Sequence, residues 1–179
     1  MKISINVSKK DYLDFNIFVM FKSKEGKKQI LLYRIAIFLL FVGFACFVVA
    51  GKELSVGTFI GIIPHLILLV LFQALLKPFM VWIVKGNIKS LSKSGKLLYS
   101  EYSEMEFCDD VFTEITADNK TEQKYSAIEE VDIIRGQAIY IRLNRLLAYI
   151  IPESCLESSE KYEELLRILR KKCSVVNEF

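Results

Sequence analysis

The chain has 179 residues, of which 53% are hydrophobic and 25% are charged, and its mean hydropathy is +0.33. Residues 1–96 carry 14 Lys and Arg against 4 Asp and Glu, whereas residues 97–179 carry 10 against 17. A basic, apolar half is therefore followed by an acidic half that is compatible with water, which marks a boundary near residue 96. Because an acidic domain repels phosphate, this division argues against nucleic acid as the partner of the second half.

The N-terminal segment, residues 1–29, is expected to combine a short strand with an amphipathic segment in the cytoplasm or at the membrane interface. Residues 2–7 alternate apolar and polar side chains, which predicts a strand. Ser8 and Asp11 have the spacing of a helix cap, and the apolar stretch 11–22 follows. That stretch is too short to cross a bilayer, so it either lies in the membrane interface or packs on the C-terminal domain.

The first long apolar run covers residues 30–50 and predicts a membrane-spanning helix. A helix of this length is about 31 Å long, close to the roughly 30 Å of a bilayer's hydrocarbon core. Its one charged residue, Arg34, lies in the first turns, from where a long side chain reaches the headgroups. Lys27 and Lys28 precede the run and mark its cytoplasmic end.

The second long apolar run covers residues 56–76 and predicts another span, with residues 79–84 as an optional extension into the interface around Trp82. Residues 85–96 are expected to form a basic linker. Only five residues, 51–55, join the two runs, so the spans must form an antiparallel helical hairpin over residues 30–84.

Lysine and arginine gather at the outer ends of the hairpin, and only Lys52 lies in its turn. Because positive residues stay on the cytoplasmic side, the sequence predicts a two-pass protein of the cell membrane (inner or plasma membrane) with cytoplasmic N- and C-termini. A cleaved signal peptide is disfavoured, because the first run begins near residue 30 and is longer than an h-region. The flanking basic residues are Lys22, Lys24, Lys27, Lys28 and Arg34 before the first run, and Lys77, Lys85, Lys89, Lys93 and Lys96 after the second.

Residues 97–179 are predicted to form a cytoplasmic α+β domain of short antiparallel strands closed by a C-terminal helix. Ser158 or Ser159 caps that helix, whose apolar side chains fall on one stripe. This order of elements is typical of pleckstrin-homology-like (PH-like) barrels. The expected strands are 99–107, 111–116, 121–125, 128–134, 137–143 and 147–151, and the stripe is Tyr162, Leu165, Leu166, Leu169 and Cys173.

The aromatic strand residues Tyr140 and Tyr149, followed by the Ile150-Ile151-Pro152 sequence, resemble the YcxB-like family of small bacterial membrane proteins over nearly the full chain. The resemblance implies a membrane location and a PH-like cytoplasmic domain, and it implies no established activity. This chain departs from the family in having Tyr125 where members commonly have Trp, and Glu153-Ser154 where they commonly have basic residues. The second departure argues against headgroup binding at that corner of the domain.

The polar residues of the second run, His65 beside Pro64 and Gln73, are candidate intramembrane functional residues, but a role in helix packing, or none beyond being tolerated there, is favoured for both. No cysteine pair has metal-ligand spacing and His65 is the only histidine, so no metal and no cofactor are expected. The acidic pairs Asp109-Asp110 and Glu129-Glu130 have no catalytic partner in the sequence, and solvated charge is favoured for them. Arg135, Arg142 and Arg145 could line a ligand groove, but a surface role that balances the acidic domain is favoured for them.

Three functions remain open from the sequence. The first is a non-enzymatic, membrane-anchored interaction module, whose partners are the bilayer and either another protein or a second copy of the chain through the hairpin. The second is a lipid-associated or transport-accessory component, favoured by the basic flanks and the aromatic 11–22 segment. The third, an enzyme acting at the membrane, is disfavoured because no catalytic constellation is present.

Overall fold

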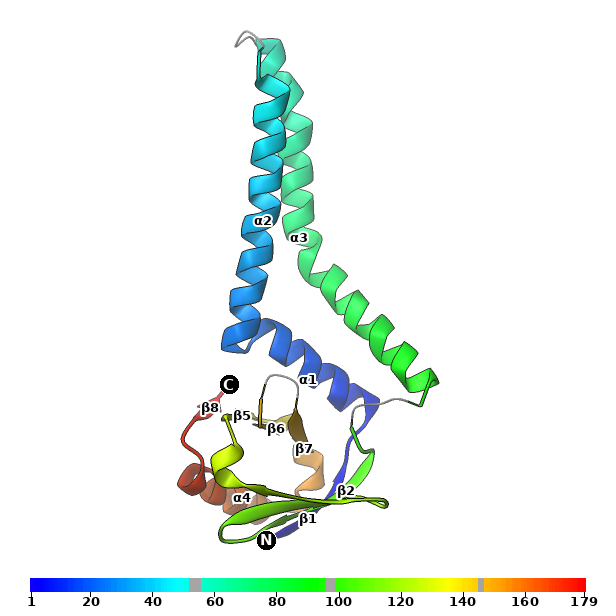
Figure 1. Ribbon diagram of the computed structural model, residues 1–179, viewed down its shortest axis with the longest axis vertical. Coiled ribbons are helices and arrows are strands. Elements are labelled where there is room, and N and C mark those ends of the chain that lie inside the picture. Colours follow the sequence, from blue (N-terminus) through cyan, green and yellow to red (C-terminus); the bar gives the residue numbers. More distant parts are fainter. Residues whose placement is uncertain (52–55, 96–98, 145–146) are drawn as a thin grey trace. The chain divides into compact units, whose positions relative to one another are not determined.

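The computed structural model describes residues 1–51, 56–95, 99–144 and 147–179, and it divides into two compact units. The first unit comprises Met1–Phe15 and Leu91–Phe179, and the second comprises Asn16–Ser90. Figure 1 shows a β-rich unit and a long helical hairpin. The predicted turn residues 52–55, the predicted domain start at residues 96–98, and Arg145 lie outside the described residues.

The β-rich unit contains two four-stranded sheets. The first sheet has the strand order β1-β2-β3-β4 and is antiparallel throughout, and the second has the order β7-β6-β5-β8. The β5–β6 and β6–β7 pairs are antiparallel, whereas β5 and β8 are parallel. The strands are β1 (Lys2–Asn6), β2 (Tyr102–Phe107), β3 (Val111–Ile115), β4 (Lys120–Lys124), β5 (Glu130–Ile134), β6 (Ala138–Arg142), β7 (Ala148–Pro152) and β8 (Val176–Glu178).

The pairing of β1 with β2 is the main departure from the expected domain plan. Lys2 lies opposite Glu106 and Asn6 opposite Tyr102, so the strand expected in a separate N-terminal segment completes the sheet of the C-terminal domain. The whole helical hairpin is thus inserted between two paired strands. The domain is therefore joined to the hairpin by two connections, one after β1 and one before β2, instead of by a single linker.

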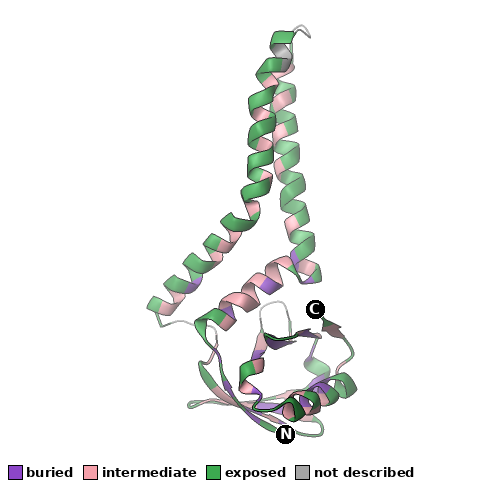
Figure 2. Cartoon of the chain, turned by 180° about the vertical axis from the view of Figure 1, so that it is seen from behind, coloured by how far each residue is buried: buried purple, intermediate pink, exposed green. Residues whose placement is uncertain are grey.

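The core of the β-rich unit is largely apolar. Phe112, Val131, Ile139, Ile141 and Ile151 have no exposed surface, and Figure 2 shows most of the buried residues in this unit. The C-terminal helix α4 (Ser159–Lys172) starts at the Ser158 cap and buries three leucines of the predicted stripe. The predicted helix and its apolar face are therefore confirmed; the buried leucines are Leu165, Leu166 and Leu169.

Helix α1 (Lys9–Phe21) begins at the cap that the sequence predicts. The backbone N–H of Ser8 donates to the Asp11 carboxylate over 2.9 Å, and the backbone N–H of Asp11 donates to Ser8 Oγ over 3.2 Å. Within the β-rich unit, the Tyr12 ring stacks on Tyr99 at 4.6 Å between centroids, and the Phe15 ring meets Tyr140 edge-on at 5.0 Å. The first turns of the segment 11–22 consequently pack on the domain.

Two long apolar helices make up most of the second unit. Helix α2 (Lys24–Val49) and helix α3 (Val56–Lys93) are each long and apolar enough to cross a membrane, and no residue in the apolar window of either is buried. Helix α3 runs through Pro64 and Pro78 and changes direction along its length (Figure 1). It also includes residues 85–93, which the sequence places in a basic linker, because the prolines interrupt single backbone hydrogen bonds without ending the helix.

The two helices run antiparallel, as the short connection requires. Gln73 Nε2 of α3 donates to the Arg34 carbonyl of α2 over 3.0 Å. The ring centroids of Phe41 and Phe72 lie 5.6 Å apart, and those of Phe44 and His65 lie 5.0 Å apart. As the residue numbers increase along α2, those of the contacting residues on α3 decrease. This is the geometry of a helical hairpin.

The turn between α1 and α2 depends on a glycine. Ser23 Oγ accepts from the Gly26 backbone N–H over 3.0 Å and donates to the Val19 carbonyl over 2.6 Å. Gly26 is buried in this turn, and a Cβ on it would lie against the backbone oxygens of Val19 and Met20. Backbone atoms cannot turn aside as a flexible side chain can, so only glycine fits.

Gly26→Ala is expected to destabilise the full chain by about 1–3 kcal/mol, because an added methyl group overpacks the turn. Thermal unfolding of the detergent-purified chain, followed by circular dichroism, measures the loss. Gly43→Ala is the matched control, since Gly43 lies in the same helix with open space around its Cβ position. Equal melting temperatures for the two variants would contradict the predicted role of this turn.

Candidate functional site

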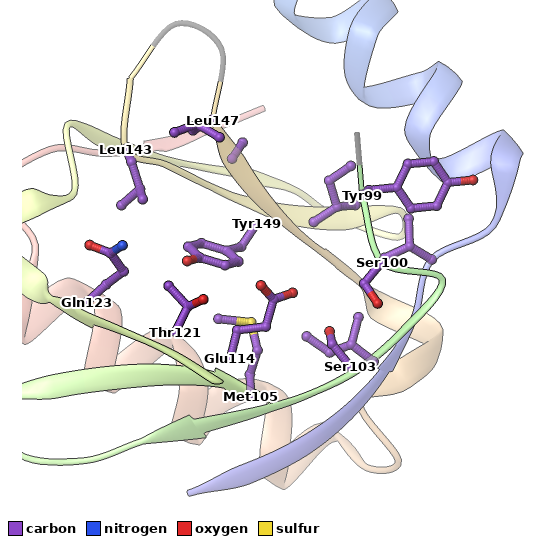
Figure 3. A pocket seen from close by; sticks show the side chains of 14 residues that line it. Tyr99, Ser100, Ser103, Met105, Glu114, Thr121, Gln123, Leu143, Leu147 and Tyr149 are labelled. Atoms are coloured by element: carbon purple, nitrogen blue, oxygen red, sulfur yellow. The ribbon is translucent and has the colours of Figure 1, made fainter. Parts of the chain in front are cut away.

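A pocket of about 440 Å³ lies in the β-rich unit, between residues of the first sheet and residues of β7 and the segment before it (Figure 3). Strands β1 to β4 supply one side, and β7 with Leu143 and Leu147, which lie between β6 and β7, supplies the other. This volume lies within the range of about 300–1,000 Å³ that is usual for small-molecule sites. The lining residues are Ile5, Val7, Tyr99, Ser100, Ser103, Met105, Glu114, Thr121, Gln123, Leu143, Leu147, Ala148, Tyr149 and Ile150.

Glu114 is the one charged residue among the described residues of this lining. Strand β3 places it between Met105 of β2 and Thr121 of β4, and Figure 3 shows its carboxylate pointing into the pocket. Burial raises the pKa of Glu114 above its ordinary value, and a hydrogen bond with the Ser103 side chain offsets part of that rise. The pocket therefore holds a half-buried carboxyl group whose charge is only partly compensated by the protein.

Tyr149 forms the aromatic wall of the pocket. Its ring meets Phe112 edge-on at 5.3 Å between centroids, which anchors it to the core. Burial, and then the nearby charge of Glu114, raise the pKa of the Tyr149 hydroxyl. Since its pKa is raised, Tyr149 stays a neutral hydrogen-bonding group at physiological pH.

The remaining pocket wall is mostly apolar, with hydroxyl and amide groups near the carboxylate. Thr121 and Gln123 of β4 and Ser103 of β2 supply the polar atoms, whereas Leu143 and Leu147 supply aliphatic surface (Figure 3). None of the described residues that line the pocket is lysine, arginine or histidine. The pocket can thus hold an apolar group of a ligand, while the Glu114 carboxylate is placed to pair with a cation or to accept a hydrogen bond.

The four residues of the family-like strand motif divide between this pocket and the core. Only Tyr149 lines the pocket. Ile151 and Pro152 are buried, and Tyr140 is 1% exposed with its ring against Phe15. Burial raises the pKa of Tyr140, with the charges of Asp14 and Asp11 adding to the effect. Three of the four motif residues thus hold the fold together.

The surface role expected for Arg142 is wrong, because its side chain is only 4% exposed. Arg142 Nε donates to the Asp132 carboxylate over 2.8 Å and also pairs with Glu130. Asn177 of β8 donates to Asp132 over 2.9 Å and to Glu130 over 3.1 Å. These four side chains form the buried charge cluster of β5, β6 and β8. Its acidic groups are matched by a cation and an amide, as a structural cluster requires.

The other predicted charged residues keep to the surface. Arg135 is exposed and pairs with Glu178 over 3.0 Å. Asp109, Asp110 and Glu129 are exposed as well. The expectation of solvated charge fails only for Glu130, which belongs to the buried charge cluster.

The hairpin residues singled out by the sequence lie on α2 and α3. His65 Nδ1 donates to the Gly61 carbonyl over 3.1 Å and the His65 ring packs on Phe44, while Gln73 Nε2 donates to a backbone carbonyl of α2. Both side chains therefore serve contacts within the hairpin. Lys27, Lys28, Arg34 and Lys77 are exposed, as is Trp82, and Lys77 Nζ lies 5.5 Å from the Phe21 ring centroid.

A second cavity, of about 530 Å³, opens between α2 and α3. Arg34 is the one charged residue among its described lining residues, and the others are apolar apart from the Gln73 amide. We call it the hairpin groove; its lining residues are Arg34, Phe38, Leu69, Val70, Gln73 and Ala74.

Glu114 is not picked out from the sequence, because the residue pattern of the strand 111–116 suggests the wrong side as the buried one. Val111, Thr113 and Ile115 look like the apolar side, yet Phe112 is fully buried on the side that carries Glu114. The available signal was the neighbourhood of Phe112, since residues i and i+2 share one face of a strand. Ser103, Thr121 and Gln123 gave no signal, because short polar residues are common in exposed strands.

Within the described ranges, no three His, Cys, Asp or Glu side chains gather in a way that could hold a metal ion. Comparison of the chain with models of known protein families, with characterised proteins and with solved structures finds no match. The site must therefore be interpreted from its own geometry.

Proposed function

We propose that this chain is a two-pass membrane protein whose hairpin anchors a non-enzymatic, PH-like binding domain. Two long helices with apolar, exposed surfaces support the membrane assignment, since such surfaces are unstable in water. Four antiparallel strands, three more antiparallel strands and a closing helix support the PH-like assignment. The resemblance of the sequence to the YcxB-like family agrees with both.

The placement of basic residues supports a cytoplasmic position for the domain. Lys27, Lys28 and Arg34 precede most of the apolar length of α2, and Lys77, Lys85 and Lys89 follow that of α3. Lysine and arginine at the outer ends of a hairpin hold those ends on the cytoplasmic side of a cell membrane. The strands of the domain continue from these same ends, so the domain shares their side.

The observation that carries the binding assignment is the pocket beside Glu114. It combines an apolar wall with a few polar groups at one side, which is the usual makeup of a small-molecule site. Within the described part of the chain, the lining residues supply no general acid–base pair and no activated nucleophile around Glu114. Binding without chemistry is therefore the activity that this geometry supports.

The membrane part of the proposal is tested by fractionating cells that express the full chain with a fluorescent protein fused after Phe179. We expect the fusion to stay in the membrane pellet after carbonate washing and to fluoresce from the cytoplasm. Alkaline phosphatase fused at the same position should be inactive in bacteria. A soluble fusion, or an active phosphatase, would overturn the two-pass arrangement.

The pocket part is tested with n-pentanol as a small apolar probe, followed by saturation-transfer NMR on the full chain in nanodiscs. Saturable binding is expected for the unchanged protein and should be lost in Ala148→Phe, which fills the pocket wall. Ser126→Phe, at an exposed position outside the lining, is the matched control. Binding that survives in Ala148→Phe would remove the pocket as the site.

A second candidate function, association with anionic lipid, is favoured by the hairpin groove. In a bilayer its apolar lining suits an acyl chain, and Arg34 suits a phosphate near the headgroup level. Lys77 lies one helical turn beyond Gln73 on α3 and adds positive charge at this end of the hairpin. A phospholipid with a net negative charge therefore fits the groove better than a zwitterionic one.

Arg34→Gln is expected to lower the retained ratio of phosphatidylglycerol to phosphatidylethanolamine by about threefold to tenfold, because one charge-assisted hydrogen bond is lost. Mass spectrometry of lipids that remain with the detergent-purified chain measures this ratio. Arg135→Gln makes the same charge change in the other unit and should leave the ratio unaltered. An unaltered ratio in Arg34→Gln would count against this second function.

A further inference from the structure

The charged groups that line the pocket beside Glu114 indicate which class of ligand it binds. It contains one carboxyl group, and no cationic side chain among the described lining residues faces it. No described lining residue supplies a cation to offset the repulsion between that carboxylate and an anionic ligand, which disfavours phosphates and carboxylic acids. A neutral ligand would leave the carboxylate's cost of burial unrelieved.

A positively charged ligand relieves that cost. An ammonium group beside Glu114 would form a charge-assisted hydrogen bond with its carboxylate, and Ser103 is close enough to Glu114 to share the ligand's N–H donors. The Tyr149 ring adds an aromatic face on the side of the pocket shown above Glu114 in Figure 3. Aromatic faces attract cations, so carboxylate and ring act on the same group.

The apolar wall of the pocket indicates the chemical character of the rest of the ligand. Leu143 and Leu147 line the pocket on the side away from Glu114 in Figure 3, and Met105, Ile5 and Ile150 add aliphatic surface. An alkyl chain directed from the ammonium group along this wall loses contact with water. The length of the ligand is limited by the cavity of about 440 Å³.

We propose that the pocket binds a small amphipathic ammonium compound, with its cation between Glu114 and the Tyr149 ring and its alkyl part against the leucine wall. This assignment rests on the proposed binding function and names the ligand class of the same pocket. It assigns Glu114 as the binding residue for the cation and Tyr149 as a wall of the site.

The test uses three probes of equal chain length: n-pentylammonium, n-pentanol and n-pentanoate. Each is titrated against the full chain in nanodiscs of zwitterionic lipid and followed by saturation-transfer NMR. We expect the order of affinity pentylammonium, then pentanol, then pentanoate. Glu114→Gln should weaken pentylammonium at least about tenfold, the effect of losing a hydrogen bond between charged groups, and should leave pentanol nearly unchanged.

The dependence on pH gives a second readout that a purely structural role of Glu114 would not produce. Alkylammonium groups stay protonated from pH 4 to pH 8, as lysine does, so only the carboxyl group titrates in that window. Pentylammonium affinity should therefore rise with pH as Glu114 loses its proton, and this rise should be absent in Glu114→Gln. Pentanol affinity should vary little over the same range.

Glu122→Gln is the matched control, because Glu122 lies on neighbouring β4 with an exposed side chain outside the lining. It should keep the affinity and the pH dependence of the unchanged protein. Equal affinities for pentylammonium and pentanol, or an unchanged pentylammonium affinity in Glu114→Gln, would overturn the ammonium assignment while leaving the pocket as a binding site. Failure of all three probes to bind saturably would overturn the proposed binding function as well.

Discussion

A chain shortened to residues 91–179 is expected to be unfolded in water, although it contains every strand that the sequence assigns to the C-terminal domain. Its sheet lacks β1, which supplies Ile3 and Ile5 at 3% exposure and leads into Val7 at 5%. Loss of three buried aliphatic side chains removes about 5–9 kcal/mol of hydrophobic stabilisation. That is comparable to the whole stability of a domain, about 5–15 kcal/mol.

The matched chain restores the strand without the hairpin. Residues 1–15 joined to residues 91–179 through about 20 Gly and Ser residues, which span roughly 25 Å, should fold and melt cooperatively. Circular dichroism and amide NMR dispersion distinguish the two chains. A cooperative melt of the 91–179 chain alone would show that β1 is dispensable and that the hairpin insertion has no role in completing the domain.

Arg142→Met is expected to destabilise the full chain by about 3–5 kcal/mol, the usual cost of removing one partner from a buried ion pair. The side chain of Asp132 is 1% exposed, so its carboxylate would remain in the interior without the guanidinium. Asn177 still donates to Asp132, but an amide carries no charge and cannot replace the ion pair. Chemical unfolding of the detergent-purified chain measures the loss.

Two further variants separate charge from packing. Arg135→Met makes the same side-chain change where the arginine is 73% exposed, and it should cost no more than about 1 kcal/mol. Adding Asp132→Asn to Arg142→Met should recover part of the stability, because the stranded charge is then gone. If Arg135→Met and Arg142→Met cost the same, the buried charge cluster would have no special role in stability.

Local patterns in the sequence were sufficient for most individual elements. The alternation of residues 137–143 predicts β6, and the Ser158 cap with its apolar stripe predicts α4. The cap formed by Ser8 and Asp11 likewise predicts the start of α1. These signals are reliable because a helix or a strand repeats its contact with the core at a fixed interval along the chain.

Strand β8 shows where such patterns fail. Val176–Glu178 has only three residues, too few for a period to be recognised. It pairs in parallel with β5, and the Val131 backbone N–H donates to the Val175 carbonyl over 2.9 Å. Parallel pairing joins segments that are distant in the chain. No pattern of neighbouring residues can therefore predict the pairing of β8 with β5.

Charged residues in strands were the other weak point. Glu114 and Arg142 have the residue types of a solvated surface, yet Glu114 points into a pocket and Arg142 is buried. Whether a charge can be buried depends on the partners that other strands bring to it. The partners of Arg142 come from β5, and the neighbours of Glu114 come from β2 and β4.

The sequence by itself determined the two long apolar helices, their antiparallel arrangement, the order of the antiparallel strands and the amphipathic C-terminal helix. Each follows from residues that are close together along the chain. Only the tertiary structure decided that β1 joins β2 across the inserted hairpin, that β8 completes the second sheet, and that Glu114 faces a pocket. These features depend on contacts between segments that are distant in the sequence. Such contacts form only when both segments are folded, so no local pattern of residues reports them.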